Sequence, residues 1–125
     1  MMVNPAPALS LNIWLEGRVT PKARPRVTRN GTYFPRRYQD WRQSAQAQIL
    51  AQVSDRSWLP IPRAAVKVQL QGAHRGDLDN LAGAVLDALV FGGILLDDRI
   101  SCVPRLSVEH QSKGQQGCWV ELVSA

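Results

Sequence analysis

The chain has 125 residues, with 15 Lys and Arg against ten Asp and Glu and a pI near 9.9. This length suits one domain built around one hydrophobic core. No apolar run approaches the roughly 20 residues that a membrane-spanning helix needs, and the first residues lack the charged-then-apolar pattern of a secretory signal. We therefore expect a cytoplasmic protein with no membrane partner, a flexible end over residues 1–10 and one domain over residues 11–125.

The positive charge is concentrated in the first half of the chain. Residues 1–63 carry ten Lys and Arg against three Asp and Glu, a net charge of +7, whereas residues 64–125 carry five against seven, a net charge of −2. A basic front and an acidic rear within one small domain suggest a surface that holds a polyanion beside a site that binds a cation.

Both cysteines, Cys102 and Cys118, fall in segments with strand-like alternation. The two histidines, His74 and His110, do not stand at the spacing that a zinc site needs. We expect two reduced thiols packed in the core, although the sequence leaves a disulfide open.

The first half of the domain predicts a strand, a long loop and a helix. Residues 11–17 alternate and indicate a half-buried strand. Residues 18–37 have no apolar period and contain three prolines, which favours a partly extended loop with Asn30-Gly31 as a turn. Pro35 then opens a helix to about Val53. Its apolar face comprises Tyr38, Trp41, Ala45, Ile49 and Val53.

The second half predicts a strand, a helix and two further strands. Residues 65–71 alternate as a strand, and Asp79 is the predicted N-cap of a helix that ends near Val90. Residues 102–108 alternate again, as do residues 118–122. The order predicts a single α+β domain, in which a mixed sheet of four to five strands is covered by two helices.

The sharpest motif is Gly76-Asp77-Leu78-Asp79-Asn80-Leu81, which follows a strand and opens a helix. Side chains two residues apart in an extended segment point the same way, so Asp77 and Asp79 can face one cavity. A strand–helix–return path can bring Asp97-Asp98 back to the same end of the sheet. Carboxylates that converge in this way are typical ligands of Mg²⁺, which can promote phosphodiester hydrolysis.

A plainer interpretation exists for each acidic residue. Asp79 can simply cap the helix, Asp77 can be a solvated loop residue, and Asp97-Asp98 can form an ordinary turn. Asp87, on the same side of the helix as Asn80, either lines the acidic cavity behind the ligands or is solvated. The second acidic pair and the basic half of the chain favour the metal site.

Between Arg18 and Arg37 the chain carries seven cations and no acid. Pro21 and Pro25 favour an extended backbone there. Because arginine forks suit phosphate oxygens, the segment predicts a salt-sensitive grip on a DNA backbone, and the alternative is a solvated loop that only improves solubility. The residues expected to bind DNA are Lys22, Arg24, Arg26, Arg29, Arg36, Arg37 and Arg75.

Several motifs occur in one order along residues 11–110. They are Pro21-Lys22-Ala23-Arg24-Pro25-Arg26, Tyr33-Phe34-Pro35, Tyr38 with Trp41, the Gly76–Leu81 motif, Leu86-Asp87-Ala88-Leu89 and Leu96-Asp97-Asp98. In combination they resemble the RusA family of Holliday-junction resolvases. The resemblance implies a small homodimer that cuts four-way DNA junctions with paired symmetric nicks, using Mg²⁺ or Mn²⁺ and no small-molecule cofactor.

By that resemblance, the catalytic residues and metal ligands are Asp77, Asp79 and Asp98, with Asp97 able to share the ligand role. One position departs from the pattern, because the family has a lysine four residues after the Asp-x-Asp motif and this chain has Gly83. The missing charge is either supplied by another cation or not supplied at all. The candidate cations are Lys22, Lys67 and Arg75.

Three hypotheses follow. The first is a nuclease whose activity persists without the lysine, because bound metal supplies most of the electrostatics. The second is a module of the same fold that holds branched DNA without cutting it. The third is a protein-interaction domain whose uneven charge serves self-association, and it predicts no salt-dependent DNA binding.

Overall fold

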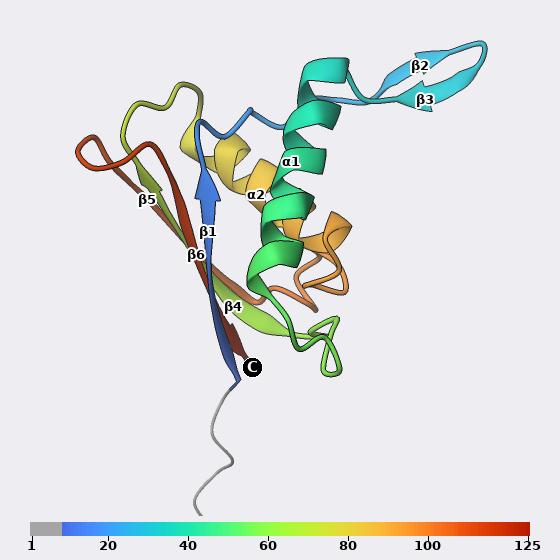
Figure 1. The fold of residues 1–125 in the computed structure, drawn as a ribbon. Coiled ribbons are helices and arrows are strands. Elements are labelled where there is room, and N and C mark those ends of the chain that lie inside the picture. The colour runs from blue at the N-terminus through green and yellow to red at the C-terminus, as the bar shows by residue number, and fades with distance from the viewer. Residues whose placement is uncertain (1–8) are drawn as a thin grey trace, which may run out of the picture.

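The computed structural model describes residues 9–125 as two layers, with two helices packed on one face of a four-stranded sheet (Figure 1). This confirms the expected α+β class. Within the described range, no helix is both long enough and apolar enough to cross a membrane. The elements are β1 (Ser10–Glu16), β2 (Arg26–Thr28), β3 (Gly31–Tyr33), α1 (Arg36–Gln52), β4 (Ala64–Gln71), α2 (Leu78–Phe91), β5 (Arg105–Gln111) and β6 (Gly117–Ser124).

The main sheet has the strand order β1-β6-β4-β5 and is mixed. β6 pairs antiparallel with both β1 and β4, whereas β4 and β5 are parallel. Parallel neighbours need a crossover connection, and α2 supplies it. The acidic motif therefore lies where β4 ends and the crossover helix begins. The first described residues lie beside the C-terminal strand, because β1 begins at Ser10 and the Leu9 N–H donates to Ser124 Oγ at 2.9 Å. Most of the expected flexible end, residues 1–8, lies outside the described part of the chain.

The core forms between the sheet and the helices because each element presents one apolar face to the other. Alternate residues of β4 are buried, and in α1 the predicted apolar face is confirmed, with Tyr38, Ala45 and Ile49 buried. α2 is more apolar still, because it packs against both the sheet and α1. Its buried residues are Leu81, Ala82, Ala84, Val85, Leu86, Ala88 and Leu89.

Part of the segment predicted as a loop is a β-hairpin, which corrects the sequence analysis. β2 and β3 pair antiparallel in a separate two-stranded sheet that projects from the body of the domain beside the start of α1 (Figure 1). The turn lies at Arg29-Asn30, one residue before the predicted position, and Gly31 adopts a φ of +119°. Thr28 Oγ1 accepts a hydrogen bond from the Asn30 N–H and donates one to the Gly31 carbonyl.

Two further predicted boundaries are wrong. The N-cap of α2 is Asp77, not Asp79, because the Asp77 carbonyl already accepts a hydrogen bond from the Leu81 N–H at 3.0 Å. β5 begins at Arg105 rather than at residue 102. Cys102 therefore lies outside a strand, in a turn closed by its own N–H and the Arg99 carbonyl.

The two cysteines are free and buried, as expected. Cys118 lies in β6 with no exposed surface. Burial raises the pKa of this thiol to about 12, because a thiolate is poorly solvated in the core. Both cysteines lie in the hydrophobic core, and Cys118 is a packing residue rather than a nucleophile.

Candidate functional site

The loop between β4 and α2 is held against the basic segment through Gly76. This glycine has a φ of +115°, and a Cβ added there would lie 3.3 Å from Pro21 Cγ. A larger residue would be strained in this conformation and would press on Pro21. Glycine thus lets the acidic loop and the proline-rich segment after β1 touch, which places carboxylates beside cations.

Asp77 and Asp79 line one cleft of about 440 Å³, which we call the acidic cleft. Both residues are exposed. Asp77 makes no side-chain cap, and Asp79 Oδ1 accepts only a local hydrogen bond, from the Asn80 N–H at 2.9 Å. The carboxylates are therefore free to bind a ligand. The other residues that line the cleft are Lys22, Ala23, Arg24, Pro25 and Asn80.

Asp98 is connected to this cleft by an ion pair with Lys22, which lines it. Lys22 Nζ lies 3.9 Å from Asp98 Oδ2, and the two side chains are 38% and 40% exposed. An ion pair this open to solvent is weak, so Lys22 can leave Asp98 at little cost. The Lys22 stem crosses α2 at Gly83, where an added Cβ would lie 3.5 Å from Lys22 Cδ. Asp98 itself does not line the cleft that holds Asp77 and Asp79.

Asp97 is more fully engaged than its neighbour. One carboxylate oxygen, Oδ2, pairs with Arg99 Nη2 at 2.5 Å, and Oδ1 accepts a hydrogen bond from the Asp98 N–H at 2.7 Å. The Asp98 N–H, and then the Arg99 guanidinium, hold the pKa of Asp97 below its usual value. Asp98, in contrast, has one ion pair within residues 9–125, and its partner is Lys22. Lys22 also lines the cleft.

Asp87 ties the two helices together. Its Oδ2 accepts a hydrogen bond from the Tyr38 hydroxyl at 2.8 Å and lies 3.2 Å from Arg42 Nη1. Burial, and then Asp87, raise the pKa of Tyr38, so the phenol stays protonated as a donor. Asp87 does not line the acidic cleft, whereas Asn80 does.

The residues expected to bind DNA separate into distinct groups. Lys22 and Arg24 line the acidic cleft, whereas Arg37 and Arg75 line a second pocket. Arg26 lies in the projecting hairpin and Arg29 in its turn, and Arg36 lies 3.9 Å from Asp40 on exposed α1 surface.

The expected set omitted Arg18, which also lines the second pocket. The run of cations from Arg18 to Arg37 included it, but only the tertiary structure groups it with Arg37 and Arg75. Of the three cations suggested as replacements for the missing lysine, Lys22 lines the acidic cleft and Arg75 lines the second pocket. Lys67 lies in a depression with Trp119 and Glu121 on the main sheet, away from the acidic cleft.

The donor atoms suit a hard divalent ion that the substrate helps to bind. Across the described residues, no three Asp, Glu, His or Cys side chains stand close enough to form a complete metal site by themselves. Mg²⁺ usually takes only one or two carboxylates and completes its shell with water and substrate phosphate. The two carboxylates in the cleft fit that pattern.

An open cleft with two carboxylates, flanked by arginines that have no acidic partner within residues 9–125, is the kind of surface that suits a polyanion and a hard cation. Residues 16–122 match the family model described as Endodeoxyribonuclease RusA, and the chain belongs to this family. The match covers most of the chain and confirms the resemblance found in its motifs. No curated protein matches the chain. Membership implies a nuclease of branched DNA and, in general, Holliday-junction resolvase activity.

Proposed function

We propose that this protein is a magnesium-dependent crossover junction endodeoxyribonuclease. It hydrolyses phosphodiesters of Holliday junctions with paired symmetric nicks, and so serves DNA recombination and repair. The observation that carries the proposal is the cleft in which Asp77 and Asp79 stand beside Lys22 and Arg24. Carboxylates alone would repel DNA, and cations alone would bind it without chemistry.

In this proposal Asp77 and Asp79 hold the metal in the cleft, and Asp98, with Asp97 beside it, joins them as a ligand once Lys22 has turned away from it. Mg²⁺, or Mn²⁺ in its place, would supply an activated water and neutralise charge on the phosphate. Arg24 orients the scissile phosphate through its guanidinium fork. Asn80 and Asp87 support the site from behind, Asn80 at the cleft wall and Asp87 by fixing α2 against α1.

In this proposal Lys22 supplies the positive charge that the chain lacks at Gly83. It lies over Gly83, lines the acidic cleft and pairs with Asp98. Lys67 lies in a different depression, and Arg75 lines the second pocket. When phosphate and metal enter the cleft, Lys22 turns from Asp98 to the phosphate oxygen on which negative charge develops.

Paired symmetric nicks require two equivalent sites, and a two-fold homodimer provides them on a four-way junction. β1 and β5 are the edge strands of the main sheet, and β5 is exposed along almost its whole length. An exposed edge strand is a ready surface for pairing with a second copy.

The deciding experiment is cleavage of a labelled synthetic four-way junction with Mg²⁺, with Mn²⁺ and with a chelator. We expect wild-type nicks that need the metal and that fall at least about 100-fold in Asp79→Asn. Glu121→Gln, which neutralises an exposed carboxylate in the central strand β6, is the matched control and keeps wild-type activity. Tight junction binding without product under either metal would show a non-cleaving binding module instead.

A further inference from the structure

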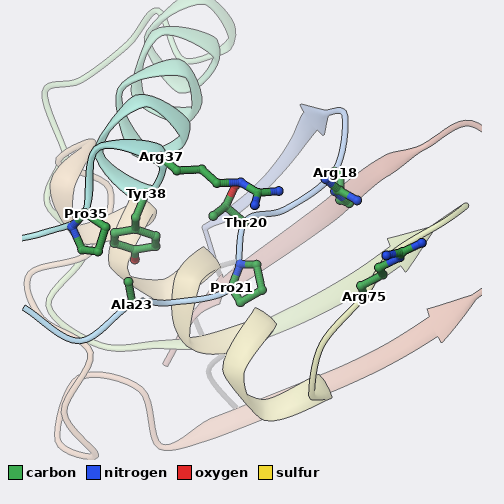
Figure 2. A pocket seen from close by; sticks show the side chains of 8 residues that line it. All are labelled: Arg18, Thr20, Pro21, Ala23, Pro35, Arg37, Tyr38 and Arg75. Atoms are coloured by element: carbon green, nitrogen blue, oxygen red, sulfur yellow. The ribbon is translucent and has the colours of Figure 1, made fainter.

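A second pocket of about 440 Å³ lies beside the acidic cleft and is basic (Figure 2). Three arginines from three separate segments line it: Arg18 after β1, Arg37 in the first turn of α1, and Arg75 in the loop before α2. Figure 2 shows Arg37 extending past Thr20 toward the side where Arg18 and Arg75 lie. Residues so far apart in sequence gather here only through the fold.

The charge of this pocket is not neutralised within the described chain. No acidic side chain appears among the described residues that line it. The ion pairs found in residues 9–125 involve Lys22, Arg36, Arg42 and Arg99, and so leave all three pocket arginines without an acidic partner. A concave surface with guanidinium groups of one sign focuses the field and attracts an anion. Guanidinium forks match the oxygens of a phosphate best.

The two pockets adjoin along one stretch of backbone. Pro21 lines the basic pocket, Ala23 lines both pockets, and Lys22, Arg24 and Pro25 line the acidic cleft. Ala23 therefore marks the boundary at which the two pockets meet. A DNA strand that crosses the segment with its scissile phosphate in the acidic cleft therefore carries a neighbouring phosphate into the basic pocket.

We propose that Arg18, Arg37 and Arg75 form a subsite for the backbone phosphate adjacent to the scissile one. The subsite sets the register of the strand, since a phosphate held there fixes which bond lies over Asp77 and Asp79. Tyr38 contributes a wall rather than a stacking surface, because it is 1% exposed. This inference rests on the proposed function, because it assumes that the cut bond lies in the acidic cleft.

The test combines arginine variants with junctions that carry one uncharged methylphosphonate linkage, placed in turn on either side of the cut site. With wild-type protein, we expect neutralisation at one of these positions to lower the rate of cleavage about tenfold. In Arg18→Ala the ionic contact is already lost, so the same linkage lowers the remaining rate less than about twofold. Arg75→Ala gives the same result independently.

Arg63→Ala is the matched control, because this arginine is exposed before β4 and lines neither the basic pocket nor the acidic cleft. It should keep the full tenfold sensitivity. If Arg18→Ala and Arg75→Ala also keep it, or if neither linkage affects wild-type cleavage, the phosphate subsite does not exist.

Failure of the proposed function would give a different result from failure of the subsite. If wild-type protein cuts no junction with Mg²⁺ or Mn²⁺, the nuclease proposal fails. The same linkages and variants are then compared by junction affinity in the presence of a chelator. Loss of sensitivity in Arg18→Ala and in Arg75→Ala, but not in Arg63→Ala, supports the subsite, and equal sensitivity in all three variants overturns it.

Discussion

The acidic cleft and the β2–β3 hairpin serve the same substrate in the proposed function, but the fold supports them in opposite ways. Asp77 and Asp79 stand at the start of α2, whose next residues, Leu81 and Ala82, are buried in the core. Every strand residue of the hairpin is exposed, and Val27 keeps 81% of its surface. An isolated two-stranded hairpin has little stability of its own.

This contrast matches what each region has to do. Hydrolysis needs donor atoms held within fractions of an ångström, and a helix anchored in the core holds them so. A grip on the DNA backbone needs only positive charge within reach of phosphates, and a projecting hairpin that adapts its position can provide it. Changes in the cleft should therefore lower the rate, and changes in the hairpin should lower affinity.

After the loss expected in Asp79→Asn, the largest effect is expected at Lys22. Lys22→Met keeps the length of the stem over Gly83 but removes the charge, so cleavage at saturating junction should fall about 10- to 100-fold with affinity nearly unchanged. The measurement is single-turnover cleavage with Mg²⁺ in excess.

A second substitution sharpens this prediction. Gly83→Lys starts from a position whose added Cβ would lie at an ordinary contact distance from Lys22 Cδ. In the Lys22→Met background it should restore much of the lost rate. Lys67→Met serves as the control and leaves the rate unchanged. A Lys22→Met protein with full activity would remove Lys22 from the proposed mechanism.

An intermediate effect is expected from the hairpin. Arg26→Ala combined with Arg29→Ala removes two cations from an element outside the main sheet. Junction affinity should fall several-fold, and the slope of log affinity against log salt should become shallower by about 1 to 2, as two phosphate contacts disappear. Fluorescence anisotropy across a salt series measures this.

If the hairpin variant binds the junction normally but cuts it slowly at saturation, the hairpin acts in the chemical step. The assignment of rate to the cleft and affinity to the hairpin would then be wrong. An unchanged salt slope would remove these arginines from the grip. Arg63→Ala, an exposed arginine before β4, controls for general charge loss.

The smallest effect concerns the support beneath the cleft. Tyr38→Phe deletes the hydroxyl that donates to Asp87, and should lower the free energy of unfolding at pH 7 by about 1 kcal/mol. Burial and then Asp87 raise the folded-state pKa of Tyr38 above its ordinary value near 10. The contribution of this proton is therefore complete below pH 10 and is lost as the pH rises above it.

The gap in stability between wild type and Tyr38→Phe should accordingly be constant from pH 7 to 9 and should narrow above pH 10. Urea unfolding at a series of pH values measures it. A gap that stays constant, or widens, at alkaline pH would contradict the assignment of Tyr38 as the proton donor to Asp87.

Patterns of neighbouring residues were enough to predict the main sheet and both helices. Period-two alternation in residues 11–17 and 65–71 reports a strand with one buried face, and helical spacing from Tyr38 to Val53 reports a helix with one apolar side. The same local logic placed Asp77 and Asp79 at a strand-to-helix junction. These features depend on which side of an element faces the core, and that is written into its own residues.

The sequence did not predict the hairpin or the start of β5, because their residues do not alternate between buried and exposed. β2 and β3 have three residues each, all exposed, so no alternation marks them. β5 is an edge strand in which Leu106 is 42% exposed, whereas Cys102 is buried outside the strand. Apolar spacing over residues 102–108 therefore placed the start of the strand three residues too early.

Only the tertiary structure decided how the charged residues divide between sites. It brings Lys22 over Gly83 to Asp98, gathers Arg18, Arg37 and Arg75 in one pocket, and turns Asp87 toward Tyr38. Sequence supplied the residue types, because local order encodes which elements form and what chemistry they carry. It did not supply these partnerships, because the distance between side chains on different elements is set by how the whole core packs.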